Sequence, residues 1–526
     1  MTPEERAHAA ADLDVAVLPD APRRLSWLRI LVVVAVLAAA TTGVISVRSI
    51  TRSTAEALPT SSFMPYVDVT ATPQYAFENP TQSTSASLVL GFVVSSKQNA
   101  CDPSWGAAYS LAAAADTMDL DRRIARLRQR GGQVAVSFGG AANSELSIDC
   151  TDPQQLLAAY TSVVHRYSVD TIDLDIEGTT ASDPAVSARR ALAMYQLQQA
   201  EKRAGRSLQV WLTLPVAPTG LTASGVSVLS AMLAAKVDVA GVNALTMDYG
   251  QSLATGQSLE AANESALTGL DHQISDAYQA IGVHLSNDAA WQRIGATPMI
   301  GQNDTVSERF SLADAQRLLA FAQRHHVRRL SMWSVNRDQA CGPNYADVAL
   351  VSPNCSGVNQ GTWAFTSVFA KFTTTAPPVT PGSAAPTSAY PVVVVPTTVD
   401  NPATSPYAIW NPVLPYPSGT KIVWHHNVYQ AKWYTQGDTP DQPVASASDT
   451  PWTLIGPVLP GEHPQPTPTL KAGTFPNWSA TTTYVAGQRV LYVGVGYQAK
   501  WYTHGDVPGV VVSDPGQTPW ELITSP

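Results

Sequence analysis

Residues 169–178 read Val-Asp-Thr-Ile-Asp-Leu-Asp-Ile-Glu-Gly, so that three carboxylates alternate with three large apolar residues. Successive side chains of a β-strand point to opposite faces. Residues 171–177 therefore predict a strand with Asp173, Asp175 and Glu177 on one face, spaced about 6–7 Å apart. Because buried carboxylates are costly unless they share protons or bind something, this strand indicates a site for chemistry.

Strand and helix patterns alternate along residues 62–372 around this segment. The expected strands are residues 65–70, 87–94, 133–138, 171–177, 208–214, 242–247, 296–300 and 329–335, and the expected helices include 120–130, 153–167, 184–204, 259–281 and 312–325. Asp152, Asp183 and Ser311 precede three of these helices, as N-cap residues should.

Eight strands alternating with helices predict an α/β fold, a (β/α)8 TIM barrel, and a doubly wound open sheet is the alternative. Catalytic groups of such barrels lie at the C-terminal ends of the strands. Glu177 ends the fourth expected strand, where that rule places an active residue.

The chain has 526 residues, which is too long for a single domain, and its formal net charge is −9. It has no basic run or stripe, so nucleic acid is not an expected partner. Its four cysteines form no CxxC pair, so we expect no metal site. An even count in an exported chain predicts two disulfides. Cys341 and Cys355 fall in one loop and are the easier pair, which leaves Cys101 with Cys150.

Residues 30–47 form an uncharged stretch of 18 residues, which is just long enough to span a bilayer. We expect a transmembrane anchor with residues 1–29 as a cytoplasmic arm and 48–61 as a stalk. A cleaved signal peptide and a buried core helix are the alternatives. The first two place the rest of the chain outside the cytoplasm, either membrane-anchored or secreted.

The C-terminal part contains an internal repeat. Residues 410–455 align with 478–523 at a constant offset, and Tyr-Gln-Ala-Lys-Trp-Tyr-Thr occurs at both 429–435 and 497–503. Pro-rich linkers at 373–404 and 457–474 separate the expected modules 405–456 and 475–526. The expected core residues of these small units are Trp410, Trp452, Trp478 and Trp520.

The spacing Asp170-x-x-Asp173-x-Asp175-x-Glu177 resembles the signature of glycoside hydrolase family 18, the chitinase family. A calcium loop is the alternative, but the intervening apolar residues suit a strand rather than a turn-rich ligand loop. The resemblance covers about residues 62–372.

Three further motifs occur in the order of that family. Ser137-Phe138-Gly139-Gly140 resembles its SxGG motif, and Thr246-Met247-Asp248-Tyr249 resembles its Met/Asp/Tyr motif. Met332-Trp333-Ser334 ends the eighth expected strand, where the family places a Trp under the bound sugar. The alternatives are core packing for Trp333 and a structural hydrogen bond for Tyr249.

The resemblance implies hydrolysis of β-1,4 bonds beside N-acetylglucosamine with retention, the substrate's own acetamido oxygen being the nucleophile. Glu177 would be the acid, Asp175 would hold the acetamido N–H and Asp173 would share a proton with Asp175. Tyr249 would hydrogen-bond the attacking oxygen. The substrate-binding set would be Asp170, Ser137, Gly139, Gly140, Met247, Asp248 and Trp333, although strand parity places Asp170 off the acidic face as structural support. The family needs no metal and no cofactor.

The repeats resemble chitin-binding modules of families 5 and 12, which share the Ala-Lys-Trp-Trp/Tyr-Thr core. Sugar rings stack on exposed aromatic faces. The expected binding residues are Trp433, Tyr434, Trp501 and Tyr502, with Tyr416 and Tyr484 as weaker candidates.

The sequence therefore predicts an exported, monomeric chitinase that two modules target to insoluble chitin. An endo-β-N-acetylglucosaminidase acting on glycoprotein or cell-wall glycan is an alternative on the same barrel. A non-catalytic chitin-binding lectin is a further alternative, although the presence of Glu177 argues against it.

Overall fold

The computed structural model describes residues 62–79, 87–178, 183–345, 347–372, 399–444, 446–464, 470–510 and 518–523. The expected arm, the anchor or signal segment at 30–47 and the stalk lie outside these residues. Within the part of the chain that is described, no helix is long and apolar enough to cross a membrane.

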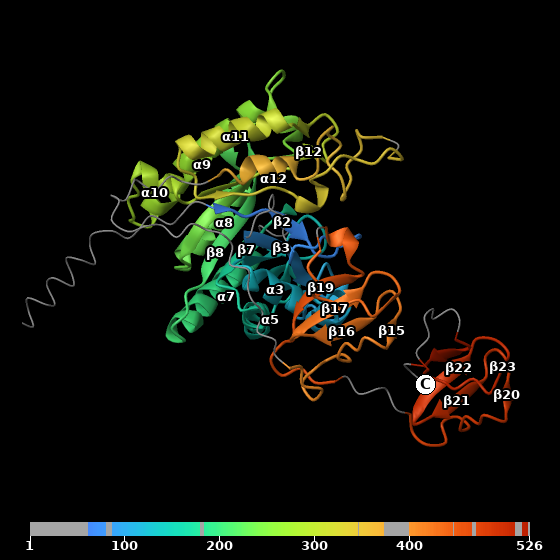
Figure 1. The fold of residues 1–526 in the computed structure, drawn as a ribbon. Helices are drawn as coiled ribbons and strands as arrows, with labels where there is room; N and C mark the ends of the chain where they lie inside the picture. The colour runs from blue at the N-terminus through green and yellow to red at the C-terminus, as the bar shows by residue number, and fades with distance from the viewer. Residues whose placement is uncertain are drawn as a thin grey trace, which may run out of the picture. The chain divides into compact units, whose positions relative to one another are not determined.

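The domain of residues 62–372 is a closed barrel of parallel strands (Figure 1). In barrel order these are β1 and β2 (Ser62–Phe63 and Tyr66–Asp68), β3 (Ser87–Ser95), β6 (Gln133–Gly139), β7 (Thr171–Asp175), β8 (Gln209–Ala217), β10 (Val239–Leu245), β11 (Ile294–Thr297) and β14 (Arg329–Leu330). Each pairs in parallel with the next, and β14 pairs in parallel with β1. Because this last pairing closes the ring, the predicted TIM barrel is confirmed and the open sheet is excluded.

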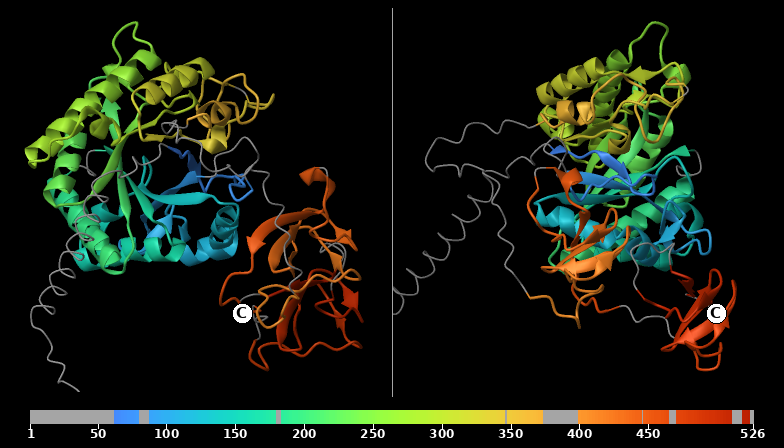
Figure 2. Two further views of the ribbon diagram at one scale, coloured as in Figure 1. Left: turned by 60° about the vertical axis from the view of Figure 1, so that its left-hand side comes forward. Right: turned by 45° about the vertical axis from the view of Figure 1, so that its right-hand side comes forward.

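Helices surround the strands, as the two views of Figure 2 show. Those with eight or more residues are α2 (Leu111–Met118), α3 (Leu120–Gln129), α5 (Pro153–Tyr167), α7 (Pro184–Arg203), α8 (Ala223–Ala234), α9 (Leu259–Ala280) and α11 (Leu312–Arg324); shorter ones are α4 (Leu146–Asp149), α10 (Asn287–Trp291) and α12 (Ala364–Phe369). The side chains of Asp152, Asp183 and Ser311 accept hydrogen bonds from backbone N–H groups of the first turn, as predicted. The expected helices therefore start where the capping residues indicated.

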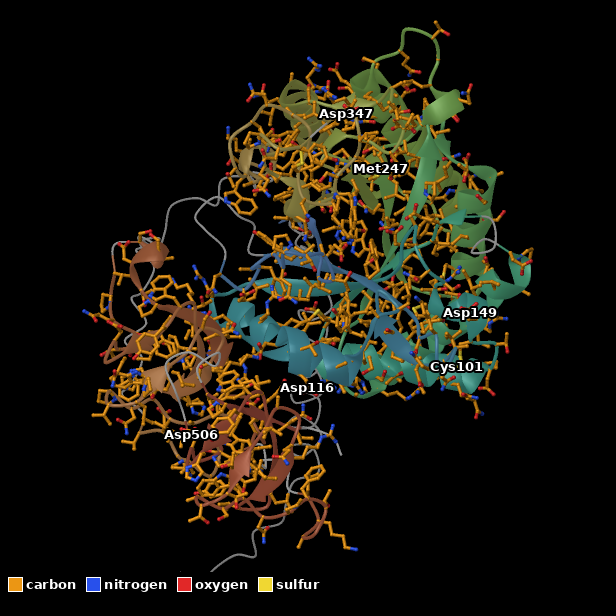
Figure 3. All side chains as sticks on the ribbon, turned by 90° about the vertical axis from the view of Figure 1, so that its right-hand side faces the viewer. Cys101, Asp116, Asp149, Met247, Asp347 and Asp506 are labelled. Atoms are coloured by element: carbon orange, nitrogen blue, oxygen red, sulfur yellow. A yellow bond between two sulfur atoms is a disulfide. The ribbon has the colours of Figure 1, made fainter. Side chains whose placement is uncertain are left out.

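The apolar face of β7 packs against this helical layer. Ile172, Leu174 and Ile176 are buried and belong to the main hydrophobic cluster together with residues of the helices. Figure 3 shows side chains filling the space between the strands and the helices. The acidic face of the same strand therefore points into the barrel.

The eighth strand is shorter than expected. Only Arg329 and Leu330 form β14, whereas Trp333 pairs with Met299 through an isolated parallel bridge. Two antiparallel strands, β4 (Pro103–Trp105) and β5 (Tyr109–Ser110), extend the sheet beside β3. The hairpin of β12 (Gly301–Gln302) and β13 (Arg309–Phe310) follows β11.

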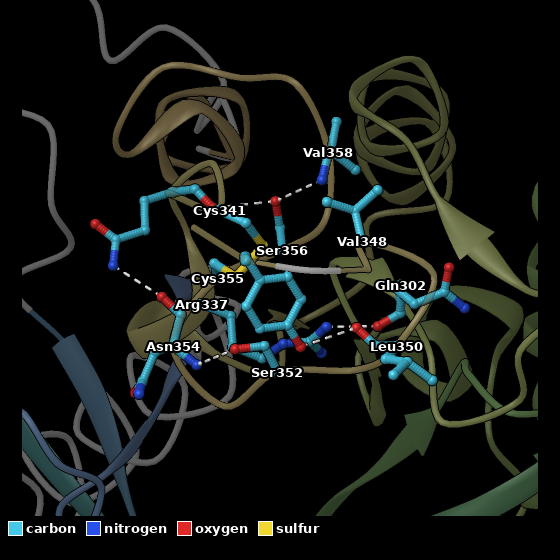
Figure 4. The surroundings of a disulfide bond; sticks show 12 residues. Gln302, Arg337, Cys341, Val348, Leu350, Ser352, Asn354, Cys355, Ser356 and Val358 are labelled. Atoms are coloured by element: carbon cyan, nitrogen blue, oxygen red, sulfur yellow. Dashed lines mark hydrogen bonds between the residues drawn. A yellow bond between two sulfur atoms is a disulfide. The ribbon is translucent and has the colours of Figure 1, made fainter. Parts of the chain in front are cut away.

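Both predicted disulfides are confirmed. Cys101 bonds to Cys150, 49 positions away, and Cys341 bonds to Cys355, 14 positions away. Figure 4 shows the second bridge within the loop that follows the barrel's last strand, where the Ser352 hydroxyl accepts a hydrogen bond from the Asn354 backbone at 3.2 Å.

The two C-terminal repeats form the same arrangement of short antiparallel strands. The first contains β15 (Pro415–Tyr416), β16 (Lys421–Trp424), β17 (Asn427–Ala431), β18 (Thr435–Gln436) and β19 (Trp452–Pro457); the second contains β20 (Thr483–Tyr484), β21 (Arg489–Tyr492), β22 (Val495–Ala499), β23 (Thr503–His504) and β24 (Trp520–Leu522). In both, the first strand pairs with the fourth and the other three form a sheet. Trp452 and Trp520 are buried as predicted, and Trp410 and Trp478 pack partly buried against the same clusters.

The weaker binding candidates Tyr416 and Tyr484 are core residues instead. Their exposed fractions are 4% and 6%, and their hydroxyls accept hydrogen bonds from the backbone N–H groups of Asn411 and Ser479. Each ring packs edge-on against the buried Trp of its own module, with centroids 5.3 and 5.2 Å apart. A unit of about 50 residues has a small hydrophobic core, so these rings are needed for its packing and are not available to a ligand.

Candidate active site

The inner face of β7 carries the acids in the predicted order. Asp173 is fully buried and Asp175 is 3% exposed, whereas Glu177 is partly buried two residues beyond the end of the strand. The backbone N–H of Ile176 still donates to the carbonyl of Thr213, so β8 guides the chain as far as Glu177. The row therefore rises from the barrel interior to its C-terminal mouth.

Asp173 is held by four donors from four other strands. Its Oδ2 accepts hydrogen bonds from the Tyr66 hydroxyl and the Ser137 hydroxyl, each at 2.8 Å. Its Oδ1 accepts from the Thr213 hydroxyl at 2.7 Å and from Arg329 Nη1 at 3.1 Å. A carboxylate offers about four acceptor positions, so these donors occupy the whole capacity of an ionised Asp173.

A polar layer surrounds this carboxylate inside the barrel. Asn243 Nδ2 donates to the Thr213 hydroxyl at 3.0 Å and to the Thr297 hydroxyl at 2.7 Å, and Thr297 donates back to Asn243 Oδ1 at 2.9 Å. All three residues are almost completely buried. The interior below the acids is thus a hydrogen-bonded network rather than an apolar core, which fixes side-chain positions closely.

Asp175 differs from Asp173 in having a free oxygen. No hydrogen-bond partner among the described residues reaches its buried Oδ1. Burial raises the pKa of this carboxyl well above its usual value, the charges of Glu177 and Asp173 raise it further, and Arg329 opposes them. Asp175 therefore has both a proton and an unused acceptor to offer to a ligand.

Glu177 has the titration behaviour of a general acid. Burial, followed by the charges of Asp248 and Asp304, raises the pKa of its carboxyl to about 7. A general acid needs a pKa near the working pH. Asp248, which the Met/Asp/Tyr motif predicted as a site residue, therefore acts on the pKa of Glu177. Asp304, from the loop after β12, acts in the same direction.

Asp248 and Met247 lie partly buried at the end of the sixth barrel strand, where Figure 3 labels Met247. Asp248 has a φ of 51° and accepts a hydrogen bond from the Thr305 backbone at 2.7 Å. Both residues therefore lie at the mouth, as the motif predicted.

Tyr249 lies away from the row. It is 4% exposed, and its hydroxyl donates to Asn263 Oδ1 in α9 at 2.8 Å. Burial, followed by the charge of Glu308, raises the pKa of this hydroxyl far above its usual value. Its contacts fit the structural hydrogen bond and not the predicted contact with the attacking oxygen, because the backbone turn after Asp248 directs the ring into the helical layer.

The Ser137-to-Gly140 segment supports the row from the neighbouring strand. Ser137 is fully buried on Asp173, so it is not available to substrate. A Cβ on Gly139 would lie 2.1 Å from the carbonyl oxygen of Asp175, and one on Gly140 would lie 3.0 Å from the Phe92 ring. The predicted substrate contacts of Ser137 and Gly139 are therefore replaced by close packing around Asp173 and Asp175.

Asp170 is separated from the site by the length of β7. It is exposed before the start of the strand, accepts a hydrogen bond from the Thr171 hydroxyl and lines a surface cleft beside α5 with His165. Seven residues of strand span roughly 20 Å. Its place in the predicted substrate-binding set is wrong, because it lies at the opposite end of β7 from Glu177, and its role as structural support stays a prediction.

Trp333 shares the barrel mouth with an aromatic residue that the sequence analysis missed. Its ring stacks on Phe92 with centroids 5.3 Å apart and meets Tyr66 edge-on at 6.1 Å. Trp333 and Phe92 are both only partly buried and pack against the small cluster inside the barrel. An aromatic surface beside an acid row suits the apolar face of a sugar ring.

The exposed aromatic pairs of the two modules match their prediction. Trp433 and Tyr434 are 46% and 45% exposed, and Trp501 and Tyr502 are 41% and 66% exposed. The described residues contain no group of three or more His, Cys, Asp or Glu side chains placed to hold a metal ion.

Comparisons with known proteins agree with this geometry. Residues 477–521 match the model of carbohydrate-binding module family 5/12. The chain is 35% identical over 331 residues to the "Probable bifunctional chitinase/lysozyme" of Escherichia coli (strain K12), covering 60% of this chain and 35% of that protein. It is 34% identical over 292 residues to "Endochitinase 11" of Metarhizium anisopliae, covering 54% of this chain and 53% of that one. The chain thus spans about a third and about half of these two relatives.

A solved structure matches the barrel. The catalytic domain of a hyperthermophilic chitinase from Pyrococcus furiosus is 30% identical, with a TM-score of 0.51 over 59% of this chain and 94% of that one. The barrel, the acid row at its mouth and these relatives define a glycoside hydrolase of the TIM-barrel class. The chain belongs to glycoside hydrolase family 18, the chitinases, and carries a family 5/12 module at residues 477–521.

Proposed function

We propose that the barrel hydrolyses β-1,4 bonds of chitin with retention, using the acetamido oxygen of the substrate as nucleophile. The observation that carries this proposal is the pair at the barrel mouth: Glu177, with a pKa of about 7, beside Asp175, whose Oδ1 has no hydrogen-bond partner among the described residues. A protonated acid and a polarising carboxyl on one strand are what such a reaction requires, and no second carboxylate nucleophile is needed.

Each group has a defined role in this scheme. Glu177 protonates the leaving oxygen and then accepts a proton from the attacking water. Asp175 accepts the acetamido N–H and stabilises the oxazolinium-like cation that forms. Trp333 and Phe92 support the sugar ring, and Asp173 fixes the electrostatic environment from below.

Two modules would retain the enzyme on the insoluble polymer. The exposed pairs Trp433–Tyr434 and Trp501–Tyr502 occupy equivalent positions at an offset of 68 in the sequence. Two weak sites on one chain raise retention through effective concentration. The first repeat, residues 405–456, is included as a binding module because it has the strand pairing and exposed aromatics of the second.

The expected domain boundaries and the N-terminal segment at 30–47 stay predictions. An extracytoplasmic enzyme, membrane-anchored or secreted, fits an insoluble polymeric substrate and two disulfide bonds. We expect the protein to act as a monomer.

The test is product analysis on a chitin hexamer. Wild-type protein should release shorter oligomers that retain the β configuration at the new reducing end, as read by NMR at early times. Glu177→Gln should lose at least about three orders of magnitude in kcat, because general acid catalysis alone contributes about 10²–10⁴-fold. Turnover by this variant at the wild-type rate would refute the assignment of the acid.

A lysozyme-type or endo-β-N-acetylglucosaminidase activity is the second candidate. It is favoured by the Escherichia coli relative, whose name includes both chitinase and lysozyme. Release of products from chitin, peptidoglycan and a high-mannose glycoprotein should be compared under one set of conditions. Faster release from peptidoglycan or from the glycoprotein than from chitin would favour the second candidate activity and contradict chitin as the substrate.

A further inference from the structure

Arg329 of β14 is a buried cation in the barrel interior. Its side chain is 1% exposed and forms an ion pair with Asp173 at 3.1 Å. Of the described residues, none accepts a hydrogen bond from its Nε or Nη2. An arginine this deeply buried in a catalytic barrel, with a single carboxylate partner, needs a reason beyond packing.

Two aromatic rings lie beside this guanidinium. Its central carbon lies 5.2 Å from the centroid of the Trp211 ring and 5.7 Å from that of Tyr66. Gly295 lies opposite Arg329 in the strand register, and a Cβ on Gly241 would meet the Trp211 ring at 2.5 Å. Gly241 of β10 thus leaves room for the Trp211 ring that lies beside Arg329. Ring faces stabilise a cation without taking protons from it.

The donors on Asp173 leave no position for a proton. Arg329 is always charged, and the Tyr66 hydroxyl remains a donor because burial and the charge of Asp173 raise its pKa well above the usual value. No described hydrogen bond joins Asp173 to Asp175, so the sharing of a proton between them that the sequence predicted lacks a bridge.

We propose that Arg329 is a positioning residue that keeps Asp173 permanently ionised, so that the exchangeable protons of the row stay on Asp175 and Glu177. The proposal rests on the proposed function for its catalytic meaning. It assigns Asp173 to the role of a fixed negative charge below the reaction rather than a proton store.

The charged groups around the row give the direction of the effect. Arg329 and Asp173 lie below Asp175, whereas Asp248 and Asp304 act on Glu177 at the mouth and the buried Arg337 interacts with those two aspartates. Arg329 lowers the pKa of Asp175. Removing its charge should raise the apparent pKa values of the row, which belong to the coupled groups together.

The experiment compares pH–rate profiles of the full chain on a soluble chitin oligomer. Arg329→Met should move the profile of kcat/KM upward by about one pH unit and lower kcat at least about tenfold, with a smaller change in KM. Arg329→Lys, which keeps the positive charge, should restore the position of the profile. A profile of Arg329→Met that superimposes on the wild type after correction for folded protein would overturn the proposal.

The matched control is Arg190→Met. Arg190 is equally buried, and its carboxylate partner at 3.1 Å is Glu145, which is not a member of the acid row. It should destabilise the protein while leaving the pH profile in place. An equal shift in this control would mean that any lost buried arginine has the effect, which also contradicts the proposal.

Infrared titration gives a readout that needs neither activity nor a stable Arg329→Met protein. Subtracting the spectrum of Asp173→Asn isolates the carboxyl of Asp173, which should show only the ionised band in folded wild-type protein between about pH 4 and 8. A protonated band that titrates in this range would refute the fixed charge. If the wild type cleaves no chitin but Asp173 remains ionised, only the proposed function fails.

Discussion

The raised pKa of Glu177 has a cost in folding stability that can be measured. Its carboxyl has a pKa of about 7 in the folded protein against 4.5 ordinarily. Each unit corresponds to about 1.4 kcal/mol, so the folded state loses about 3 kcal/mol once Glu177 must ionise in both states. Below pH 4.5 Glu177 is protonated in both the folded and the unfolded protein, so its pKa shift no longer lowers the free energy of unfolding. The loss of stability therefore grows as pH rises from 4.5 to the pKa of the folded state.

Glu177→Gln removes this ionisation and should therefore stabilise the protein in a pH-dependent way. Relative to wild type, the variant should gain stability as pH rises from about 4.5, reaching about 3 kcal/mol above pH 8. For a barrel of about 310 residues, a free-energy gain of about 3 kcal/mol near the unfolding temperature corresponds to a rise in Tm of about 5 °C.

The assay is thermal and chemical denaturation of both proteins at about pH 4.5 and pH 8.5. Asp276→Asn, which removes an exposed carboxylate of α9, is the matched control and should show no such pH-dependent gain. A difference in Tm between Glu177→Gln and wild type that is the same at both pH values would refute the reasoning. The comparison across pH cancels any fixed effect of the amide, since Gln does not titrate.

Three further outcomes follow from the same contacts. The kcat/KM of the wild type on a chitin oligomer should fall as pH rises through about 7, because Glu177 then loses the proton that it must donate; a flat profile up to pH 9 would contradict this. Trp433→Ala and Trp501→Ala should each lower retention on insoluble chitin in pull-down assays, and the double variant should lower it by more than the product of the single effects. Hydrolysis of soluble oligomers should not change. Tyr416→Phe is the control, because it removes a buried hydroxyl and leaves the exposed rings in place. Tyr249→Phe should lower the free energy of unfolding in urea by about 1 kcal/mol, because the hydrogen bond to Asn263 is lost, and should change kcat less than about twofold. A loss of kcat near that of Glu177→Gln would show that Tyr249 takes part in catalysis.

The elements of the barrel were predictable because their signals are local. Alternation of acids and apolar residues marked β7, and N-cap residues located the starts of α5, α7 and α11. The eighth strand was overestimated because residues 330–335, four of which are apolar, look like a strand. Only Arg329 and Leu330 form β14, and Trp333 stacks on Phe92.

Motif residues were only partly assigned correctly. Tyr249 and Ser137 stand in the expected motifs, but the direction of each side chain depends on backbone turns and partners outside the motif. The aromatic pattern also predicts binding for Tyr416 and Tyr484, because aromatic residues in small modules serve both core and ligand; their burial shows that these two belong to the core.

The polar interior of the barrel is visible in the sequence as polar residues at inward positions of apolar strands. Thr213 and Asn243 interrupt apolar strands at inward positions, and Arg329 opens the last strand beside Arg328. Such inward polar residues on several strands indicate a shared interior network. Which of them would meet could not be read from the sequence, since strand register is set by pairing across the closed ring.

The sequence by itself determined the order of strands and helices, the acid row on one face of β7 and the repeat at the C-terminus, because periodicity and spacing are properties of neighbouring residues. Only the tertiary structure decided the state of those acids. The donors on Asp173 come from residues 36 to 156 positions away, and the unpaired oxygen of Asp175 and the raised pKa of Glu177 arise from burial inside the ring. Closure of the barrel brings these distant groups together, and their burial away from solvent strengthens the effect of their charges on one another.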